Sequence, residues 1–194
     1  MRHAALDTIN DEHQALAAML RSLSLLLAQT RRDGLPPDFE VLRAMLFYVD
    51  EFPEQRHHRK ESEWLFPRVR LRCPELAPVL DRLEHDHAQG EQAIRALEHA
   101  LLAYEVMGEP RRAAFEQAVE RYIRFYLEHM ALEEQQVLPA ARRSLQAEDW
   151  VELDAAFAAN RDPFTGHAVE ADYEPLFRKI LMHVPAPIGL GPAR

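Results

Sequence analysis

The sequence is poor in cysteine, in long apolar runs and in basic charge, and each shortage excludes a class of protein. Its 194 residues contain one cysteine, Cys73, so an intramolecular disulfide framework and a cysteine-based zinc site are excluded. The apolar runs of the sequence are far shorter than a membrane span, and no charged-then-apolar leader is present. With a lone thiol that suits a reducing compartment, these shortages predict a soluble, cytoplasmic protein.

An excess of basic residues is also missing. The formal net charge is −9, so the chain lacks the large basic patch with which a general binder of nucleic acid or anionic membrane displaces counterions. Small clusters such as Arg111-Arg112 do not reverse this balance. We therefore predict no nucleic-acid partner and no membrane partner.

Glycine is scarce, with 6 residues, and no alternating β-branched run is flanked by hairpin turn residues. Apolar residues instead recur at helical spacing, which predicts an all-α chain. Short turns between the helices favour an up-and-down antiparallel four-helix bundle over residues 1–145. The expected helices begin at Asp7 or Thr8, at Asp38 with an interruption at Pro53, near residues 74–78, and shortly before Phe115.

Residues 146–194 form a second predicted region. A short fifth helix is expected over 147–159, and the rest is rich in proline and glycine, with one helical stretch near 173–183. We interpret this region as a C-terminal extension that packs on the bundle or at an oligomer contact, which allows a homodimer.

One stretch of the sequence occurs twice. Residues 57–67, HHRKESEWLFP, align without a gap with residues 129–139, HMALEEQQVLP. The alignment places His57 over His129 and Glu61 over Glu133, and both copies end in proline. A histidine and a glutamate four residues apart lie on one helix face, at a spacing that lets both bind one metal centre.

The duplication predicts a matching pair of histidines on the first and third helices. His13 lies on an apolar stripe, and His87 lies on a similar stripe, with apolar residues at most of the same relative positions. His85 lies at the same 72-residue offset as the repeated motif, but its neighbours are polar. His87 is therefore the preferred partner of His13, and His85 is the alternative.

Four histidines at equivalent helix positions, two of them with a glutamate one turn on, favour a metal site over ordinary core histidines. The buried glutamates would be destabilising without cations beside them. Six donors exceed the needs of one tetrahedral zinc and suit iron or manganese, and two ions bridged by the carboxylates use all of them. The predicted metal-binding residues are His13, His57, Glu61, His87, His129 and Glu133.

This pattern resembles the hemerythrin-like family, specifically the bacterial proteins with a hemerythrin HHE cation-binding domain. The resemblance covers roughly residues 6–143 and rests on the paired motifs and the single histidines of the first and third helices. It implies a non-haem di-iron centre in which Glu61 and Glu133 bridge two iron ions together with an oxo or hydroxo group. The four histidines would be terminal ligands, and manganese or zinc are the alternative metals.

Several neighbours of the motif have two interpretations. Glu91 is either a further ligand or a solvated helix residue, and His58, about 100° round the helix from His57, is expected at the surface or behind a ligand. Tyr122 and Tyr126 are assigned to core packing in preference to a hydrogen bond with a ligand or a bound oxygen species. Glu134 and Glu63 are expected to be solvated.

Three functions are compatible with such a site. The histidine-rich donor set favours binding or sensing of a small oxidant, O2, NO or peroxide, at an open coordination position. The second function is that of a di-iron oxidase or peroxidase, or of a protein that delivers iron for metal-centre repair. The third is iron storage or a structural metal site. Oxygen-activating di-iron enzymes usually carry more carboxylates, in ExxH pairs. The sequence leaves open whether the protein is an enzyme.

Overall fold

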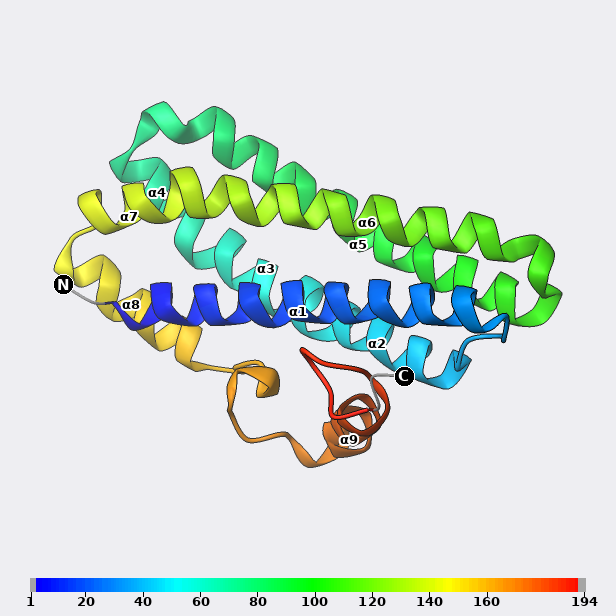
Figure 1. The fold of residues 1–194 in the computed structure, drawn as a ribbon. Coiled ribbons are helices and arrows are strands. Elements are labelled where there is room, and N and C mark those ends of the chain that lie inside the picture. Colours follow the sequence, from blue (N-terminus) through cyan, green and yellow to red (C-terminus); the bar gives the residue numbers. More distant parts are fainter. Residues whose placement is uncertain (1–2, 192–194) are drawn as a thin grey trace.

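The fold is all-α, as the helical spacing of apolar residues predicts. The computed structural model describes residues 3–191, and every regular element in that range is a helix (Figure 1). Within the same range, no helix combines the length and the hydropathy needed to span a bilayer.

Four long helical segments run in alternating directions and pack against one another (Figure 1). The first and third are single α-helices, whereas the second and fourth contain wider, π-helical turns. The bounds are α1 Ala4–Asp33; α2 Phe39–Val49, η1 Asp50–His57, α3 His58–Lys60, η2 Glu61–Leu65 and α4 Phe66–Arg72; α5 Ala77–Met107; and α6 Arg112–Leu132, η5 Glu133–Val137 and α7 Leu138–Ser144. The short helical turns η3, Pro74–Leu76, and η4, Glu109–Arg111, precede α5 and α6.

The proline at the end of each repeated motif explains the wider turns. In a π-helical turn, a backbone N–H bonds to the carbonyl five residues earlier instead of four. The N–H of Phe66 bonds in this way to the carbonyl of Glu61, and the N–H of Leu138 bonds to that of Glu133. The next residue in each case is the proline, whose ring would clash with the carbonyl four residues back in a regular α-helix. The wider turn lets the chain continue as a helix through the motif.

Pro53 is associated with a similar irregularity just before the first motif. The predicted interruption at Pro53 takes the form of the π-helical turn η1, which contains this proline. The N–H of His58 bonds to the carbonyl of Pro53, five residues earlier. Helical faces downstream of Pro53 are therefore rotated relative to those of a regular α-helix.

The predicted start of the first helix, at Asp7 or Thr8, is wrong. α1 begins at Ala4, and Thr8 lies inside the helix, where its hydroxyl donates to the carbonyl of Ala4 at 3.0 Å. The additional turn is stabilised by a contact with the extension, because the N–H of Ala5 donates to the carboxylate of Asp154 at 2.7 Å. The predicted start of the second helix at about Asp38 is confirmed: α2 begins at Phe39, and the carboxylate of Asp38 caps it by accepting from the N–H groups of Glu40 and Val41.

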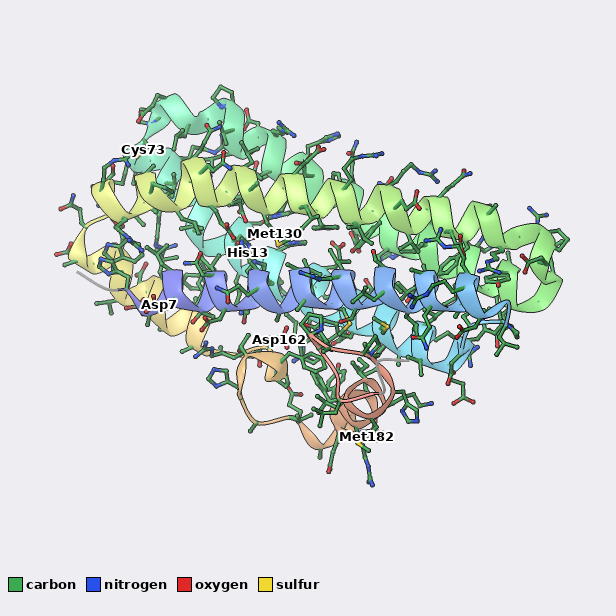
Figure 2. All side chains as sticks on the ribbon, in the orientation of Figure 1. Asp7, His13, Cys73, Met130, Asp162 and Met182 are labelled. Carbon is green, nitrogen blue, oxygen red and sulfur yellow. The ribbon has the colours of Figure 1, made fainter. Side chains whose placement is uncertain are left out.

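Two apolar clusters fill the interior, and a polar layer separates them. One cluster includes Leu16 and Leu20 of α1 together with residues of α2, α5, α6 and α9. The other includes Leu6 and Ile9 of α1 together with residues of α4, α5, α7 and α8. His13 lies on α1 between these two sets and points towards the interior (Figure 2). Polar side chains in this layer are therefore shielded from water on both sides.

The C-terminal extension lies along the first two helical segments (Figure 1). α8, Ala147–Ala158, packs against α1, and α9, Glu174–His183, packs against α2, at the positions where helices are predicted. The short turns η6, Pro163–Thr165, and η7, Ala171–Tyr173, lie between them, and η6 contacts α1. The end of the predicted extension, residues 192–194, lies outside the described residues, and a domain boundary at residue 145 stays a prediction.

Candidate metal centre

The six predicted metal-binding side chains meet in the polar layer. They come from six elements on four helical segments: His13 from α1, His57 from η1 and Glu61 from η2 on the second segment, His87 from α5, and His129 from α6 and Glu133 from η5 on the fourth. Glu61 and Glu133 are fully buried, at 0% exposure. The imidazoles surround them and are themselves almost inaccessible, since even His87 exposes only 9% of its side chain.

Glu61 lies at the centre of this group. Its carboxylate oxygens lie 3.0 Å from Nε2 of His57, 3.5 Å from Nε2 of His87 and 3.8 Å from Nε2 of His13. These three histidines come from three separate segments of the bundle, so Glu61 is the point at which the helices converge.

Glu133 occupies the equivalent position in the second copy of the motif. Its Oε2 lies 3.2 Å from Nε2 of His13 and 3.9 Å from Nε2 of His129. All four oxygens of Glu61 and Glu133 lack a hydrogen-bond partner among the described residues. An uncompensated buried carboxylate costs roughly several kcal/mol. The residues therefore fit a cationic group bound between them.

Two sets of donor atoms are compact enough to hold an ion. His13, His57 and Glu61 form one set, and His58, Glu61, His87 and His129 form the other; within each set the donor atoms lie within 4.8 Å of one another. Glu61 belongs to both sets, which is the placement required of a carboxylate shared by two ions.

His58 is not at the surface, so that interpretation of it is wrong. It is 4% exposed, its Nδ1 lies 3.1 Å from Oε2 of Glu54, and its ring stacks on His87 with 4.3 Å between centroids. The 100° rotation from His57 assumes a regular α-helix, whereas π-helical turns lie directly before and after α3. The position equivalent to His58 in the second motif is Met130, so this histidine has no counterpart there.

The outer nitrogens of the motif histidines face acidic residues on the other helix of the same half of the duplicated structure. Nδ1 of His57 donates to Glu12 at 2.7 Å, and Nδ1 of His129 lies 3.6 Å from Asp86, longer than a hydrogen bond. Glu12 directly precedes His13, and Asp86 directly precedes His87. The same relation therefore occurs in both halves of the duplicated structure.

The histidines of α1 and α5 are held in a second symmetric pair of contacts. Nδ1 of His13 donates to Glu134 at 3.0 Å, and Nδ1 of His87 is hydrogen-bonded to the hydroxyl of Ser62 at 2.9 Å. Glu134 and Ser62 each follow directly after a motif glutamate. Glu134 is partly solvated, as predicted, but it also orients His13. Metal-binding histidines characteristically donate their second nitrogen in this way, which fixes the tautomer and the ring orientation.

Glu54 organises the surroundings of His58. Besides contacting His58, its carboxylate accepts hydrogen bonds from the hydroxyls of Tyr122 at 2.6 Å and Tyr126 at 2.5 Å. Both tyrosines are therefore more than packing residues, because they hold the carboxylate that holds His58. Burial raises the pKa of Glu54 to about 7, although the hydrogen bonds from the two tyrosines oppose this rise.

Gly90 of α5 makes room for this network. A Cβ at position 90 would lie 1.8 Å from the hydroxyl of Tyr126 and 2.9 Å from Oε2 of Glu54. The corresponding position on α1, three residues after His13, is Leu16. The glycine therefore belongs to the half of the site that carries His58.

Protons balance the buried carboxylates when no metal is bound. Burial lowers the pKa of His13, but its close contact with Glu133 and its hydrogen bond to Glu134 outweigh this effect and raise the pKa to about 9. Burial likewise lowers the pKa of His57, but the charge of Glu61 and the hydrogen bond to Glu12 raise it to about 10. Both imidazoles are therefore protonated at neutral pH in the metal-free chain.

The two alternative residues of α5 lie outside the cluster. His85 is exposed and hydrogen-bonded to Gln89 at 2.8 Å, whereas His87 points into the centre. Glu91 is bound to Arg95 at 2.6 Å, with 47% of its side chain exposed. Glu12, Glu54, Ser62 and Asp86 were not predicted, although the first and last could have been suspected because each precedes a predicted histidine of α1 or α5.

A Gly90→Ala substitution tests whether this close approach is required. We expect a loss of about 1–3 kcal/mol in the free energy of unfolding, despite the higher helix propensity of alanine, because the new methyl group overlaps Tyr126 and Glu54. Thermal unfolding of the metal-free protein measures this loss. Gly90→Ala/Tyr126→Phe should recover part of it, since the nearest overlapping atom is removed. Wild-type stability in the single variant would contradict the close packing of Tyr126 and Glu54 against Gly90.

Comparison with known protein families agrees with a cation site at this cluster. The family model described as the hemerythrin HHE cation binding domain matches residues 4–141. Searches of curated proteins and of solved structures found no match. The model covers all six predicted metal-binding residues and ends before α8. The chain therefore belongs to the hemerythrin family of HHE cation-binding domains.

Proposed function

We propose that this protein is a non-haem di-iron protein that binds or senses a small oxidant, O2, NO or peroxide, at the His/Glu cluster. The observation that carries the proposal is the pair of fully buried carboxylates, Glu61 and Glu133, whose four oxygens lack hydrogen-bond partners among the described residues and face imidazoles. Such a pair is destabilising by itself and becomes favourable beside two cations.

The donor atoms divide between two ions. His13 and His57 would hold one ion and His58, His87 and His129 the other, with Glu61 and Glu133 between them. Imidazole combined with carboxylate suits iron or manganese better than the sulfur-rich sites of structural zinc. Bound iron would supply the capacity to exchange electrons with a small ligand, and the apolar clusters on both sides of the layer exclude bulk water.

Metal content is the first test of the proposal. Wild-type protein expressed with iron should contain about two ions per chain, because the cluster has two compact donor sets. Glu61→Ala and Glu133→Ala should each lose most of the metal and lower the melting temperature, since each removes a shared carboxylate. Glu63→Ala, at an exposed position beside Glu61, is the matched control. Elemental analysis showing unchanged iron in both cluster variants would refute the site.

The class of function is tested by the response to oxidant. A visible absorption band that changes reversibly when the iron-loaded protein is cycled with O2 would support binding or sensing. Steady consumption of peroxide would instead support the oxidase or peroxidase alternative, and transfer of iron to an acceptor would support iron delivery.

The role of His58 can be separated from that of the other histidines of the cluster. His58→Ala should reduce the metal content from about two ions per chain to about one, because it removes one of three imidazoles from a single donor set. His85→Ala, which changes an exposed histidine, should leave the content unchanged. Two ions retained in His58→Ala would show that this residue is not a ligand.

Metal binding at pH 7 should release protons. His13 and His57, with pKa values of about 9 and about 10, carry protons in the metal-free protein and must lose them to bind a cation. Apparent affinity should therefore rise as the pH increases towards these values. Calorimetric titration with Zn2+ in two buffers of different ionisation enthalpy measures the release, and equal heats in both buffers would contradict it.

A further inference from the structure

A small cavity lies on one side of the proposed metal centre. Its volume is about 10 Å3, and its lining includes His13 and His57. Glu12, Lys60 and Asp162 also belong to its lining, most of which is apolar. This volume is close to the minimum that holds one water molecule, so the cavity suits a ligand of one or two non-hydrogen atoms.

The cavity lies on the side of the cluster that has fewer imidazoles. The donor set there consists of His13, His57 and Glu61, whereas the opposite set has three histidines with the shared glutamate. With Glu133 also shared between the ions, two imidazoles and two carboxylates still leave a six-coordinate iron with positions open for a further ligand. An ion on this side would therefore have an open position, and the cavity lies against two of its donor residues, His13 and His57.

Lys60 has a hydrogen-bond donor to spare at this cavity. Its ammonium lies 3.1 Å from each carboxylate oxygen of Glu12 and 5.2 Å from the centre of the Phe157 ring. An ammonium has three protons, and the contacts with Glu12 use two of them. The equivalent residue in the second motif is Leu132, so this donor exists on one side of the cluster.

Asp162 closes the cavity from the extension. Its backbone N–H donates to Glu12 at 3.3 Å, and Glu12 in turn accepts from His57. Its carboxylate accepts from the hydroxyl of Tyr48 and from the N–H of Phe164, and the residue is 5% exposed. Figure 2 shows Asp162 where the extension meets α1. The segment is thus fixed to the bundle beside a predicted ligand.

We propose that residues 160–162 form the lid of a ligand pocket at the metal centre and that Lys60 donates a hydrogen bond to the ligand bound there. The ligand is a molecule of one or two non-hydrogen atoms that accepts a hydrogen bond. This inference rests on the proposed function and adds to it a specificity residue and a role for the extension, which lies outside the matched domain.

Lys60→Met tests the hydrogen bond, with nitric oxide as the probe. Iron-loaded, reduced protein is mixed with nitric oxide and the dissociation rate is followed optically. We expect dissociation to become about tenfold faster, the effect of losing one hydrogen bond to a charged donor. Lys179→Met is the matched control, because Lys179, the other lysine of the chain, is bound to Glu40 on the surface.

Iron content distinguishes a failure of the proposed function from a failure of the assignment of Lys60. If wild-type protein contains no iron, the proposed function fails. If Lys60→Met contains as much iron as Lys179→Met and releases nitric oxide at the same rate, only the assignment of Lys60 fails. Lys60→Gln, which keeps a neutral N–H donor, replaces Lys60→Met if the latter loses iron, and it should show a smaller acceleration of release.

Asp162→Ala tests the lid. We expect faster association of nitric oxide, because the substitution removes the contacts with Tyr48 and Phe164 that fix the segment. In the metal-free protein, hydrogen exchange should become faster over residues 159–166 and stay unchanged in α6. Wild-type rates of both association and exchange would overturn the assignment of the lid.

Discussion

The burial of two carboxylates in one layer is the constraint on which the rest of the structure depends. Glu61 and Glu133 are completely inaccessible and lie between two apolar clusters, where bulk water does not reach their charge. Such an arrangement is stable only if positive charge is supplied from within the layer. In the metal-free chain, protonated His13 and His57 supply it, and in the loaded protein the cations do. The surrounding imidazoles can therefore serve either state, which makes the fold compatible with loss and uptake of metal.

The duplication accounts for what the sequence could and could not predict. Apolar stripes identify the helices, and the four-residue spacing identifies the motif, because both are local features of one helix. The choice of His87 over His85 also follows from a stripe. The partners of the outer nitrogens depend instead on how neighbouring helices cross. Glu12 and Asp86 reach across to the motif histidines, and nothing in their own helix indicates which residue they meet. Their equivalent positions before His13 and His87 become meaningful only once the helices are packed.

The residues that break the symmetry of the duplicated structure contact one another. At the positions equivalent to His58, Glu54 and Gly90, the duplicated sequence has Met130, Tyr126 and Leu16. The four residues of the network depend on one another: Glu54 holds His58, Tyr126 donates to Glu54, and Gly90 leaves the space that both occupy. This side of the cluster therefore has an additional imidazole and no room beside it. Sequence reasoning missed the network because the π-helical turns around α3 shift His58 inward, and helical periodicity assumes that no such shift occurs.

The extension meets the bundle on the side of the cluster that has fewer imidazoles. The donor set with three imidazoles includes His87 of α5. The set with two imidazoles lies between α1 and η1, on the face that residues 160–162 cover. The N–H of Asp162 and Nδ1 of His57 both donate to Glu12. A displacement of the extension would therefore alter the orientation of His57, and a change in the orientation of His57 would in turn displace the extension. Such coupling is reciprocal by thermodynamic necessity. Beyond the matched domain, the extension thus contributes a segment that contacts Glu12, the hydrogen-bond partner of a predicted metal-binding histidine.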